Sequence, residues 1–309
     1  MTRLAFLFPG QGSQVVGMGR SFYDASPAAK AVFEEANDAL GFDLAKLAFH
    51  GPESELALTA NTQPAVLTAS VAAATVCRER GLTPSLAAGH SLGEYSALVV
   101  AGALRFADAV RVVRKRGQFM QKAVPVGTGA MAAIMGLELA VVETLCAEVA
   151  QGEVLDVANI NSAGQIVIAG HRPAVERAVA VAGKKSVLLP VSAPFHCALM
   201  APAAERLAGE LLSVTASDPV LPVVRNVDAG VTRTAADVKP FLLQQVASPV
   251  RWTECVHRLV AEGATAFVEV GPGRVLTGLL RRIVDGARGY SIEDTAGLER
   301  TLAAFGASA

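Results

Sequence analysis

A serine lies between two glycines in the stretch GHSLG, residues 89–93. This spacing fits a nucleophile elbow, in which a strand turns into a helix so sharply that only glycines fit beside the serine. The stretch follows the apolar residues 85–88 and opens a helix-like segment, so the amide of Leu92 would lie at a helix N-terminus, where an oxyanion can bind. A serine that only punctuates a turn is the alternative to a nucleophilic Ser91, because short motifs also arise by chance.

A nucleophilic serine needs a base, and the chain has five histidines. Three of them are placed by sequence on a polar helix face or beside turn residues: His257, His50 and His171. His90 adjoins Ser91 and shares its turn, so it reaches the hydroxyl with difficulty. His196 closes the stretch LLPVSAPFH and is the best candidate, with a loop histidine that merely forms hydrogen bonds as the alternative. Cys197 points away from its neighbour His196 in an extended chain, which argues against a Cys/His pair.

The segment ADAVRVVRKRGQFMQKAV, residues 107–124, shows helical periodicity. Most of its charged residues share one solvated face, whereas Arg116 falls on the apolar face, one turn from Val112 and Met120. A guanidinium there stays protonated and must meet an anion or other acceptors. Two interpretations remain at this point: an internal ion pair, or a fork that binds a carboxylate on a substrate.

The glycine-rich turn PGQGSQ, residues 9–14, is neither a Walker loop nor a dinucleotide fingerprint, because no Gly-Lys-Ser/Thr follows and Val15 replaces the third glycine. Its exposed backbone N–H groups either have a structural role or complete an oxyanion hole. The stretch GPGRVL after residue 270 reads as a structural turn and helix start.

The elements around these residues predict an α/β fold. Apolar runs at residues 4–8, 85–89 and 265–270 alternate with alanine-rich helical segments, as in a parallel sheet covered by helices, and their carboxyl ends are expected to face one crevice. The middle of the chain predicts the order βαββαβ, a ferredoxin-like unit. Its elements are expected at residues 130–136, 140–150, 155–161, 165–170, 173–182 and 186–191. We therefore expect a large domain at residues 1–126 and 197–309, interrupted by a small domain at 127–196, with hinges near residues 124–129 and 190–194.

Composition narrows the functional class. The formal net charge of −1 and the absence of a basic tail argue against nucleic-acid binding. No apolar run reaches the roughly 18 residues needed to cross a membrane, and the N-terminus does not resemble a signal peptide, so we expect a cytoplasmic protein. The four scattered cysteines predict reduced thiols, and neither a metal nor a redox cofactor is expected.

Together these stretches resemble the malonyl-CoA:acyl carrier protein transacylases of bacterial type II fatty acid synthesis. The likeness runs nearly end to end through FPGQGSQ, TQPAVLTAS, GHSLGEYSALVVAGAL, RGQFMQ, NINSAGQIVIAG, PVSAPFHCALM, NVDA, SPVRW and VEVGPGRVLTGL. The resemblance implies a large α/β-hydrolase-like domain interrupted by a ferredoxin-like one, in agreement with the element order.

The resemblance also implies roles for particular residues. Ser91 corresponds to the acyl-carrying nucleophile, His196 to its base, and Arg116 to the arginine that binds the malonyl carboxylate. The backbone amides of Gln11 and Leu92 correspond to the oxyanion donors, and the backbone carbonyl of Gln245 orients the histidine, with Gln244 as the adjacent alternative. The substrate site would hold, beside Arg116, the side chains of Gln11, Gln63 and His90. Phe195 before the histidine fits a malonyl-selective pattern.

The implied reaction is a ping-pong transfer of malonyl from malonyl-CoA, through an ester on Ser91, to the phosphopantetheine thiol of holo acyl carrier protein. Three alternatives remain: a related acyltransferase that serves a polyketide carrier, a serine thioesterase or hydrolase that releases free acid, and a non-enzymatic docking module of a larger synthase. The last would require the loss of the nucleophile or the base, and both are present.

Overall fold

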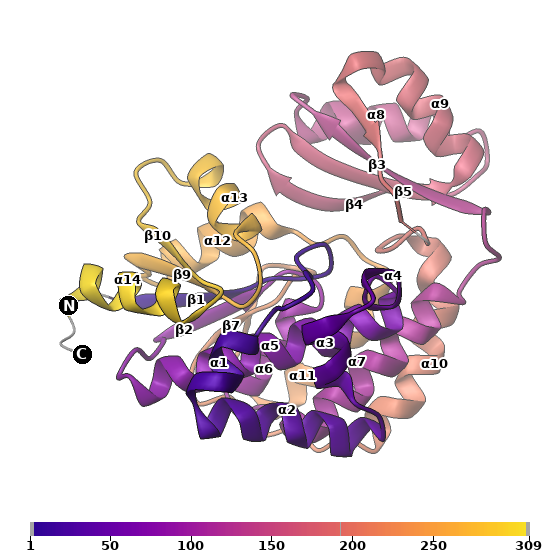
Figure 1. Ribbon diagram of the computed structural model, residues 1–309. Helices are drawn as coiled ribbons and strands as arrows, with labels where there is room; N and C mark the ends of the chain where they lie inside the picture. Colours follow the sequence, from indigo (N-terminus) through magenta and orange to yellow (C-terminus); the bar gives the residue numbers. More distant parts are fainter. Residues whose placement is uncertain (1–2, 192, 307–309) are drawn as a thin grey trace.

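The computed structural model describes residues 3–191 and 193–306, which form two lobes built on two separate sheets (Figure 1). The larger sheet has the strand order β10-β9-β1-β2-β7-β8. Its strands are β1 (Leu4–Phe8), β2 (Leu86–Gly89), β7 (Val223–Val224), β8 (Val231–Thr232), β9 (Ala266–Val270) and β10 (Gly289–Ile292). Neighbouring strands are parallel from β10 to β7, which confirms the predicted parallel sheet. Strand β8 alone pairs antiparallel, because the short turn after β7 can only return the chain antiparallel.

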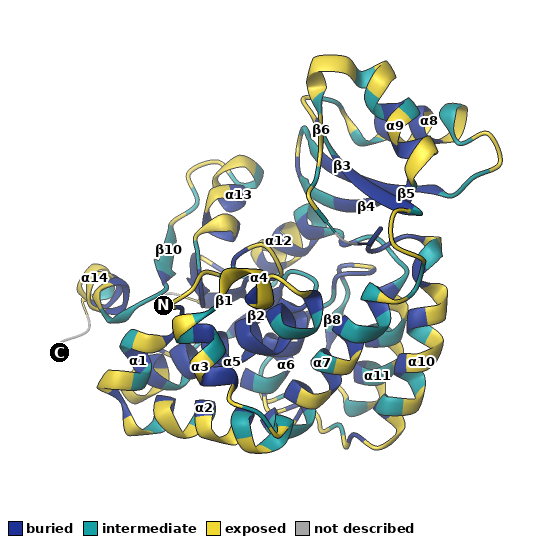
Figure 2. Cartoon of the chain, turned by 45° about the vertical axis from the view of Figure 1, so that its right-hand side comes forward, coloured by how far each residue is buried: buried dark blue, intermediate teal, exposed yellow. Residues whose placement is uncertain are grey.

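Helices cover both faces of this sheet, and its central strands are buried throughout, as Figure 2 shows by colour. The helices that precede the small lobe are α1 (Arg20–Ala25), α2 (Pro27–Leu40), α3 (Leu44–His50), α4 (Glu53–Leu56), α5 (Thr59–Glu79), α6 (Gly93–Val100) and α7 (Phe106–Gln121). Those that follow it are η2 (Ala198–Met200), α10 (Ala201–Leu212), α11 (Ala235–Val246), α12 (Trp252–Ala261), α13 (Val275–Ile283) and α14 (Thr295–Phe305).

The smaller sheet has the order β4-β5-β3-β6 and is antiparallel throughout, with α8 and α9 on its outer face (Figure 1). Its elements are β3 (Gly129–Met135), α8 (Leu139–Val149), β4 (Leu155–Ser162), β5 (Gln165–His171), α9 (Arg172–Ala182), η1 (Gly183–Lys185) and β6 (Ser186–Leu188). The predicted βαββαβ order is confirmed. The last strand is shorter than expected because Pro190 lacks the N–H needed to extend the ladder. The exact domain boundaries at 126/127 and 196/197 stay a prediction, and residue 192 of the second expected hinge lies outside the described residues.

Two of the three turns expected at one crevice line the same cavity. Gln11 and Gly12 follow β1, and Ser91 and Leu92 follow β2. The turn after β9 instead packs beneath the first turn, where a Cβ on Gly273 would lie 3.4 Å from the Cβ of Ser13. This turn therefore supports the site from outside the cavity.

Candidate active site

Ser91 occupies a strained turn between β2 and α6. Its backbone has a φ of 51°, in the left-handed region that non-glycine residues rarely adopt. A Cβ added to Gly89 would collide with the backbone of Gly93, and one added to Gly93 would collide with the carbonyl of Phe8 on β1. Both glycines of the motif are therefore required by close backbone approach, as in a nucleophile elbow.

His196 lies against the serine hydroxyl, with 2.7 Å between its Nε2 and Ser91 Oγ. Its Nδ1 lies 2.9 Å from the main-chain oxygen of Gln245 in α11. Because a carbonyl oxygen only accepts, Nδ1 carries the proton and the free Nε2 accepts from the serine hydroxyl. The acceptor belongs to the buried Gln245, whereas Gln244 is exposed.

Burial and, after it, the charge of the nearby Arg116 together lower the pKa of His196 to about 3. The charged imidazolium loses its hydration there and is repelled by the guanidinium. His196 is therefore neutral near pH 7 and able to take a proton from Ser91.

Arg116 is 1% exposed and lies on the apolar face of α7, as predicted. Its Nη1 donates to Gln63 Oε1 at 2.9 Å, and its Nη2 donates to Ser91 Oγ at 3.1 Å and to Gln245 Oε1 at 2.9 Å. Nε has no acceptor among the described residues. Over residues 3–191 and 193–306 no carboxylate forms an ion pair in direct contact with it, so the interpretation as an internal ion pair is wrong in that form, and the guanidinium has only uncharged acceptors.

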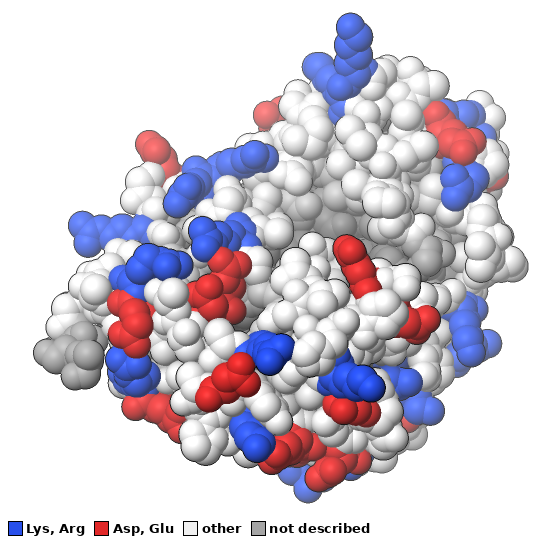
Figure 3. Space-filling model, in the orientation of Figure 1, with Lys and Arg blue, Asp and Glu red and all other residues white. Residues whose placement is uncertain are grey.

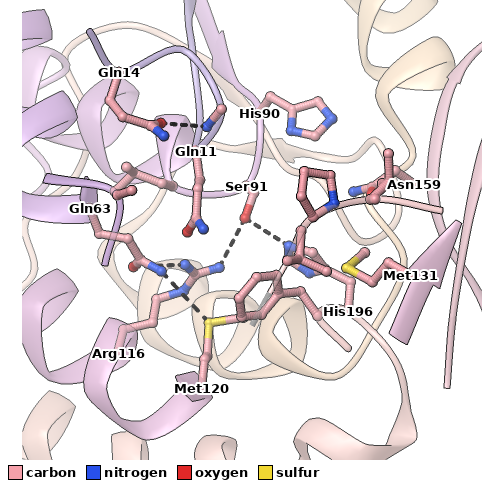
Figure 4. Close-up of a pocket in the computed structure, with 17 residues that line it drawn as sticks. Gln11, Gln14, Gln63, His90, Ser91, Arg116, Met120, Met131, Asn159 and His196 are labelled. Carbon is pink, nitrogen blue, oxygen red and sulfur yellow. Dashed lines mark hydrogen bonds between the residues drawn. The ribbon is translucent and has the colours of Figure 1, made fainter. Parts of the chain in front are cut away.

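Gly117 explains how Arg116 reaches the site. A Cβ at Gly117 would lie 2.6 Å from the main-chain oxygen of Thr59, at the start of α5. Its absence lets α7 pack closely against the first turns of α5, which also carry Gln63. Two helices far apart in the sequence thus bring an arginine and its acceptor together beside Ser91 (Figure 4).

The backbone amides of Gln11 and Leu92 belong to the two turns that line the cavity beside Ser91. Leu92 is the N-cap of α6, and Gln11 follows β1, whose neighbour β2 carries the elbow. Neither amide has an acceptor among the backbone and side-chain groups that the structure describes. Both residues line the cavity that holds Ser91, so two N–H donors remain available to a bound acyl group.

The cavity has a volume of about 400 Å³ and lies between the lobes. Figure 4 shows Gln11, Gln63, Arg116 and His196 around the Ser91 hydroxyl, and Asn159 and Met131 on the side of the small lobe. The surface is hollowed between the lobes, and the walls of this hollow are largely uncharged (Figure 3). The buried Arg116 is the cationic side chain among the lining residues, so it dominates the charge that an acyl group meets.

His90 also lines the cavity, although its imidazole is engaged elsewhere. Its Nε2 donates to Asn161 Oδ1 at 2.9 Å, and its ring centroid lies 5.5 Å from that of Trp252. Burial lowers the pKa of His90, so the ring is neutral near pH 7. The other histidines lie away from Ser91: His257 and His50 are exposed, and His171 accepts from the Val154 amide.

Sequence analysis assigned no role to Glu94 and Asn226, which hold the backbone of the elbow in place through hydrogen bonds. Asn226 Oδ1 accepts from the Ser91 amide at 2.7 Å, and Asn226 Nδ2 donates to the Gly89 carbonyl at 2.8 Å. Glu94 Oε2 accepts from the Asn226 amide at 3.0 Å and from Gln245 Nε2 at 2.7 Å. The available signal was the acid at position 94, directly before the apolar segment YSALVV, because a charge on a buried helix must meet hydrogen-bond donors.

Three further features concern the protein class. None of the helices in the described part of the chain is both long enough and apolar enough to cross a bilayer. Within residues 3–191 and 193–306 no three His, Cys, Asp or Glu side chains gather in a way that could hold a metal ion. The four cysteines are buried and unpaired in this same part of the chain.

Comparison with known proteins identifies the family. Residues 5–306 match the family described as the acyl transferase domain. The malonyl CoA-acyl carrier protein transacylase of Salmonella typhimurium is 51% identical over 98% of this chain and 99% of its own length. The crystal structure of an acyl carrier protein S-malonyltransferase from Vibrio cholerae is 48% identical, with a TM-score of 0.95 over 97% of this chain and 100% of that one. A malonyl-transacylase solved in complex with a type II polyketide synthase acyl carrier protein is also 48% identical, with a TM-score of 0.95 over 98% of this chain and 100% of that one. The chain therefore belongs to the acyl transferase domain family and, within it, to the malonyl CoA-acyl carrier protein transacylases.

Proposed function

We propose that this protein transfers a malonyl group from malonyl-CoA to the phosphopantetheine thiol of holo acyl carrier protein, for fatty acid biosynthesis. The observation that carries the proposal is that the Ser91 hydroxyl contacts two groups with different roles. Ser91 Oγ is in contact with the neutral base His196, at 2.7 Å, and with the buried cation Arg116, at 3.1 Å. The first pair suits acyl transfer, and the second selects an acyl group that ends in a carboxylate.

In the first half-reaction Ser91 Oγ attacks the thioester carbonyl of malonyl-CoA while His196 Nε2 takes the hydroxyl proton. The amides of Gln11 and Leu92 donate to the oxyanion of the tetrahedral intermediate. The C–S bond then breaks, His196 returns the proton to the leaving sulfur, and coenzyme A departs. A malonyl ester remains on Ser91, with its carboxylate on Arg116.

In the second half-reaction the carrier thiol gives its proton to His196 and attacks the ester carbonyl. The ester C–O bond breaks, and the proton passes to Ser91 Oγ. Gln245 holds the imidazole through its main-chain oxygen in both halves. Gln63 and Gln245 hold Arg116 in line with the hydroxyl through their side-chain oxygens.

The direct test is intact-mass measurement after brief mixing with malonyl-CoA, followed by addition of holo acyl carrier protein. The proposal predicts a malonyl adduct that persists in buffer without a thiol and is lost when the carrier is added; Ser91→Ala should give no adduct. An adduct that decays to free malonate at the same rate without the carrier would identify a hydrolase instead.

A polyketide carrier is a second acceptor to consider, because the structure of a malonyl-transacylase with a type II polyketide carrier is similar to this chain throughout. Discharge of malonyl-Ser91 by fatty acid and polyketide carriers in parallel separates the two. Faster discharge by the polyketide carrier would reassign the physiological acceptor without changing the chemistry at Ser91.

All the groups that the mechanism uses are protein side chains and amides. We therefore expect transfer to be unchanged after dialysis against a chelator, and loss of activity would contradict the absence of a metal cofactor.

We also place the protein in the cytoplasm, where coenzyme A thioesters are used. Cell fractionation tests that location, and recovery with the membrane or outside the cell would contradict it.

A further inference from the structure

Two opposite charges are buried beneath the elbow without touching each other. Arg116 is 1% exposed and Glu94 is 2% exposed. Within residues 3–191 and 193–306 neither of them forms an ion pair. An isolated buried charge is costly, so each should have a partner close enough to balance it.

A single amide group connects the two charges. Gln245 Oε1 accepts from Arg116 Nη2 at 2.9 Å, and Gln245 Nε2 donates to Glu94 Oε2 at 2.7 Å. The negative end of the amide dipole thus faces the cation, and the positive end faces the anion. The main-chain oxygen of the same residue holds His196, so Gln245 contacts both the base and the selectivity arginine.

We infer that Glu94 is the counter-charge of Arg116, acting through the side chain of Gln245, and that it sets how strongly the site prefers an acyl group with a carboxylate. This inference rests on the proposed function. Before substrate binds, Glu94 balances the guanidinium and keeps it in place. When a malonyl carboxylate arrives, two anions share one cation, so Glu94 weakens carboxylate binding. Glu94 is a positioning residue and does not touch the acyl group.

Protonation of Glu94 should have the same effect as removing its charge. Glu94 faces Arg116 on α7, Arg225 beyond β7, Tyr95 on its own helix and Cys255 on α12. Burial raises the pKa of Glu94, and because the hydrogen-bond donors and the arginines offset this only in part, the pKa is about 7. As the pH falls through this value Glu94 becomes neutral, whereas the malonyl carboxylate, an ordinary carboxylic acid, stays ionised above about pH 5.

The test is the ratio of kcat/KM for malonyl-CoA to that for acetyl-CoA in acylation of Ser91. Because both substrates need His196, the ratio cancels the titration of the base. Glu94→Gln keeps an oxygen for the Asn226 and Gln245 donors and removes the charge, with an NH2 group in place of the second oxygen. At an effective dielectric constant near 20, the charge of Glu94, which the Gln245 amide separates from Arg116, should change the affinity for a carboxylate by about tenfold. The ratio at pH 8 should therefore be higher in Glu94→Gln than in the wild type by about that factor. In the wild type the ratio should rise as the pH falls from 8 to 6, and in Glu94→Gln it should be flat.

Glu269→Gln is the matched control. Glu269 is also a buried carboxylate, but it accepts from the Leu276 and Thr277 amides at the start of α13, away from the cavity. This variant should lower the free energy of unfolding and leave the malonyl-to-acetyl ratio unchanged. If Glu269→Gln changes the ratio as much as Glu94→Gln does, the effect comes from general destabilisation, and the inference is overturned.

An unchanged or lower ratio in Glu94→Gln, or a pH trend that persists in it, would also overturn the inference. If Glu94→Gln does not fold, the wild type decides: a ratio that rises from pH 8 to pH 6 supports the inference, and a flat ratio overturns it. Failure of the proposed function looks different, because the wild type would then form no malonyl adduct on Ser91 at all.

Discussion

At Ser91 one oxygen atom takes part in two hydrogen bonds of opposite sense. It donates to His196 Nε2 at 2.7 Å and accepts from Arg116 Nη2 at 3.1 Å. The guanidinium bond polarises the hydroxyl while the site is empty, and a substrate carboxylate can compete for the same donors. Selection of the acyl group and activation of the nucleophile are thus linked through a single side chain.

Arg116→Ala should remove malonyl selectivity. The loss of a charge-assisted partner for the malonyl carboxylate should lower kcat/KM for malonyl-CoA by a factor of about 30 or more, with acetyl-CoA turnover kept or raised. Acylation rates with the two thioesters measure this. Lys115→Ala is the control, because Lys115 lies on the exposed face of the same helix. Unchanged malonyl preference in Arg116→Ala would contradict the assigned role.

The lowered pKa of His196 predicts the pH profile. The base must be neutral to take the serine proton, so the rate is lost only as the pH falls through the folded pKa of about 3. If the base were an ordinary histidine with a pKa near 6.5, the rate at pH 5 would be about thirtyfold lower than with a fully neutral base. We expect kcat/KM for malonyl-CoA not to fall between pH 7 and pH 5. A decline with a midpoint near pH 6.5 would place the base in a more solvated state.

The site residues differed in how far the sequence alone could identify them. Ser91, His196 and Arg116 could be selected from spacing, elimination and helical periodicity, because each is an unusual residue type in its local pattern. The sequence left open whether Arg116 had an internal partner, since that depends on which carboxylates lie nearby in space. Glu94 and Asn226 escaped notice because the hydrogen bonds that join Asn226 to Glu94 and to the elbow connect residues more than 130 positions apart.

At the scale of elements, the elbow depends on the close approach of β1, β2 and α6. Strands β1 and β2 pair in parallel register, with Phe8 opposite Gly89. This pairing places the Phe8 carbonyl where a side chain at Gly93 would lie. The order and type of these elements followed from hydrophobic periodicity, whereas the antiparallel β8 and the early end of β6 depend on local turn and proline effects.

Substitution at the elbow tests this packing. Gly93→Ala should lower the free energy of unfolding by more than about 3 kcal/mol and abolish acylation, because the added methyl group meets backbone that cannot move cheaply. Chemical denaturation measures the change. Gly209→Ala, in the exposed middle of α10 with open space around it, should instead stabilise by about 0.5–1 kcal/mol. Equal effects at the two glycines would contradict a sterically required elbow.

At the scale of the whole molecule, the small lobe is tied to the large one by more than its two connecting segments. The Val250 amide donates to the Ala158 carbonyl, and the Ile160 amide donates to the Val250 carbonyl, both at 2.9 Å. The inner face of the small sheet contributes Met131, Val167 and other residues to the main core, while its outer face packs on α8 and α9. A cavity wall attached in this way has a fixed position relative to Ser91.

Hydrogen exchange should report this attachment. We expect the amides of Ile160 and Val250 to exchange as slowly as those of β1. The two lobes must separate before either of these hydrogen bonds can break and expose its amide to water. The amide of Gly136, which bonds to the Gly164 carbonyl at the outer tip of the small lobe, should exchange faster. Nuclear magnetic resonance at residue resolution measures this order. Fast exchange at Ile160 and Val250 would instead indicate a freely hinged small lobe.

The most direct test of the proposed mechanism is a crystal structure of the malonyl-enzyme, formed with malonyl-CoA in the absence of carrier protein. We predict an ester on Ser91 Oγ, its carbonyl oxygen within hydrogen-bond distance of the Gln11 and Leu92 amides, and both carboxylate oxygens on Arg116. A carboxylate that points to the cavity mouth, or an acyl group attached to another residue, would contradict it.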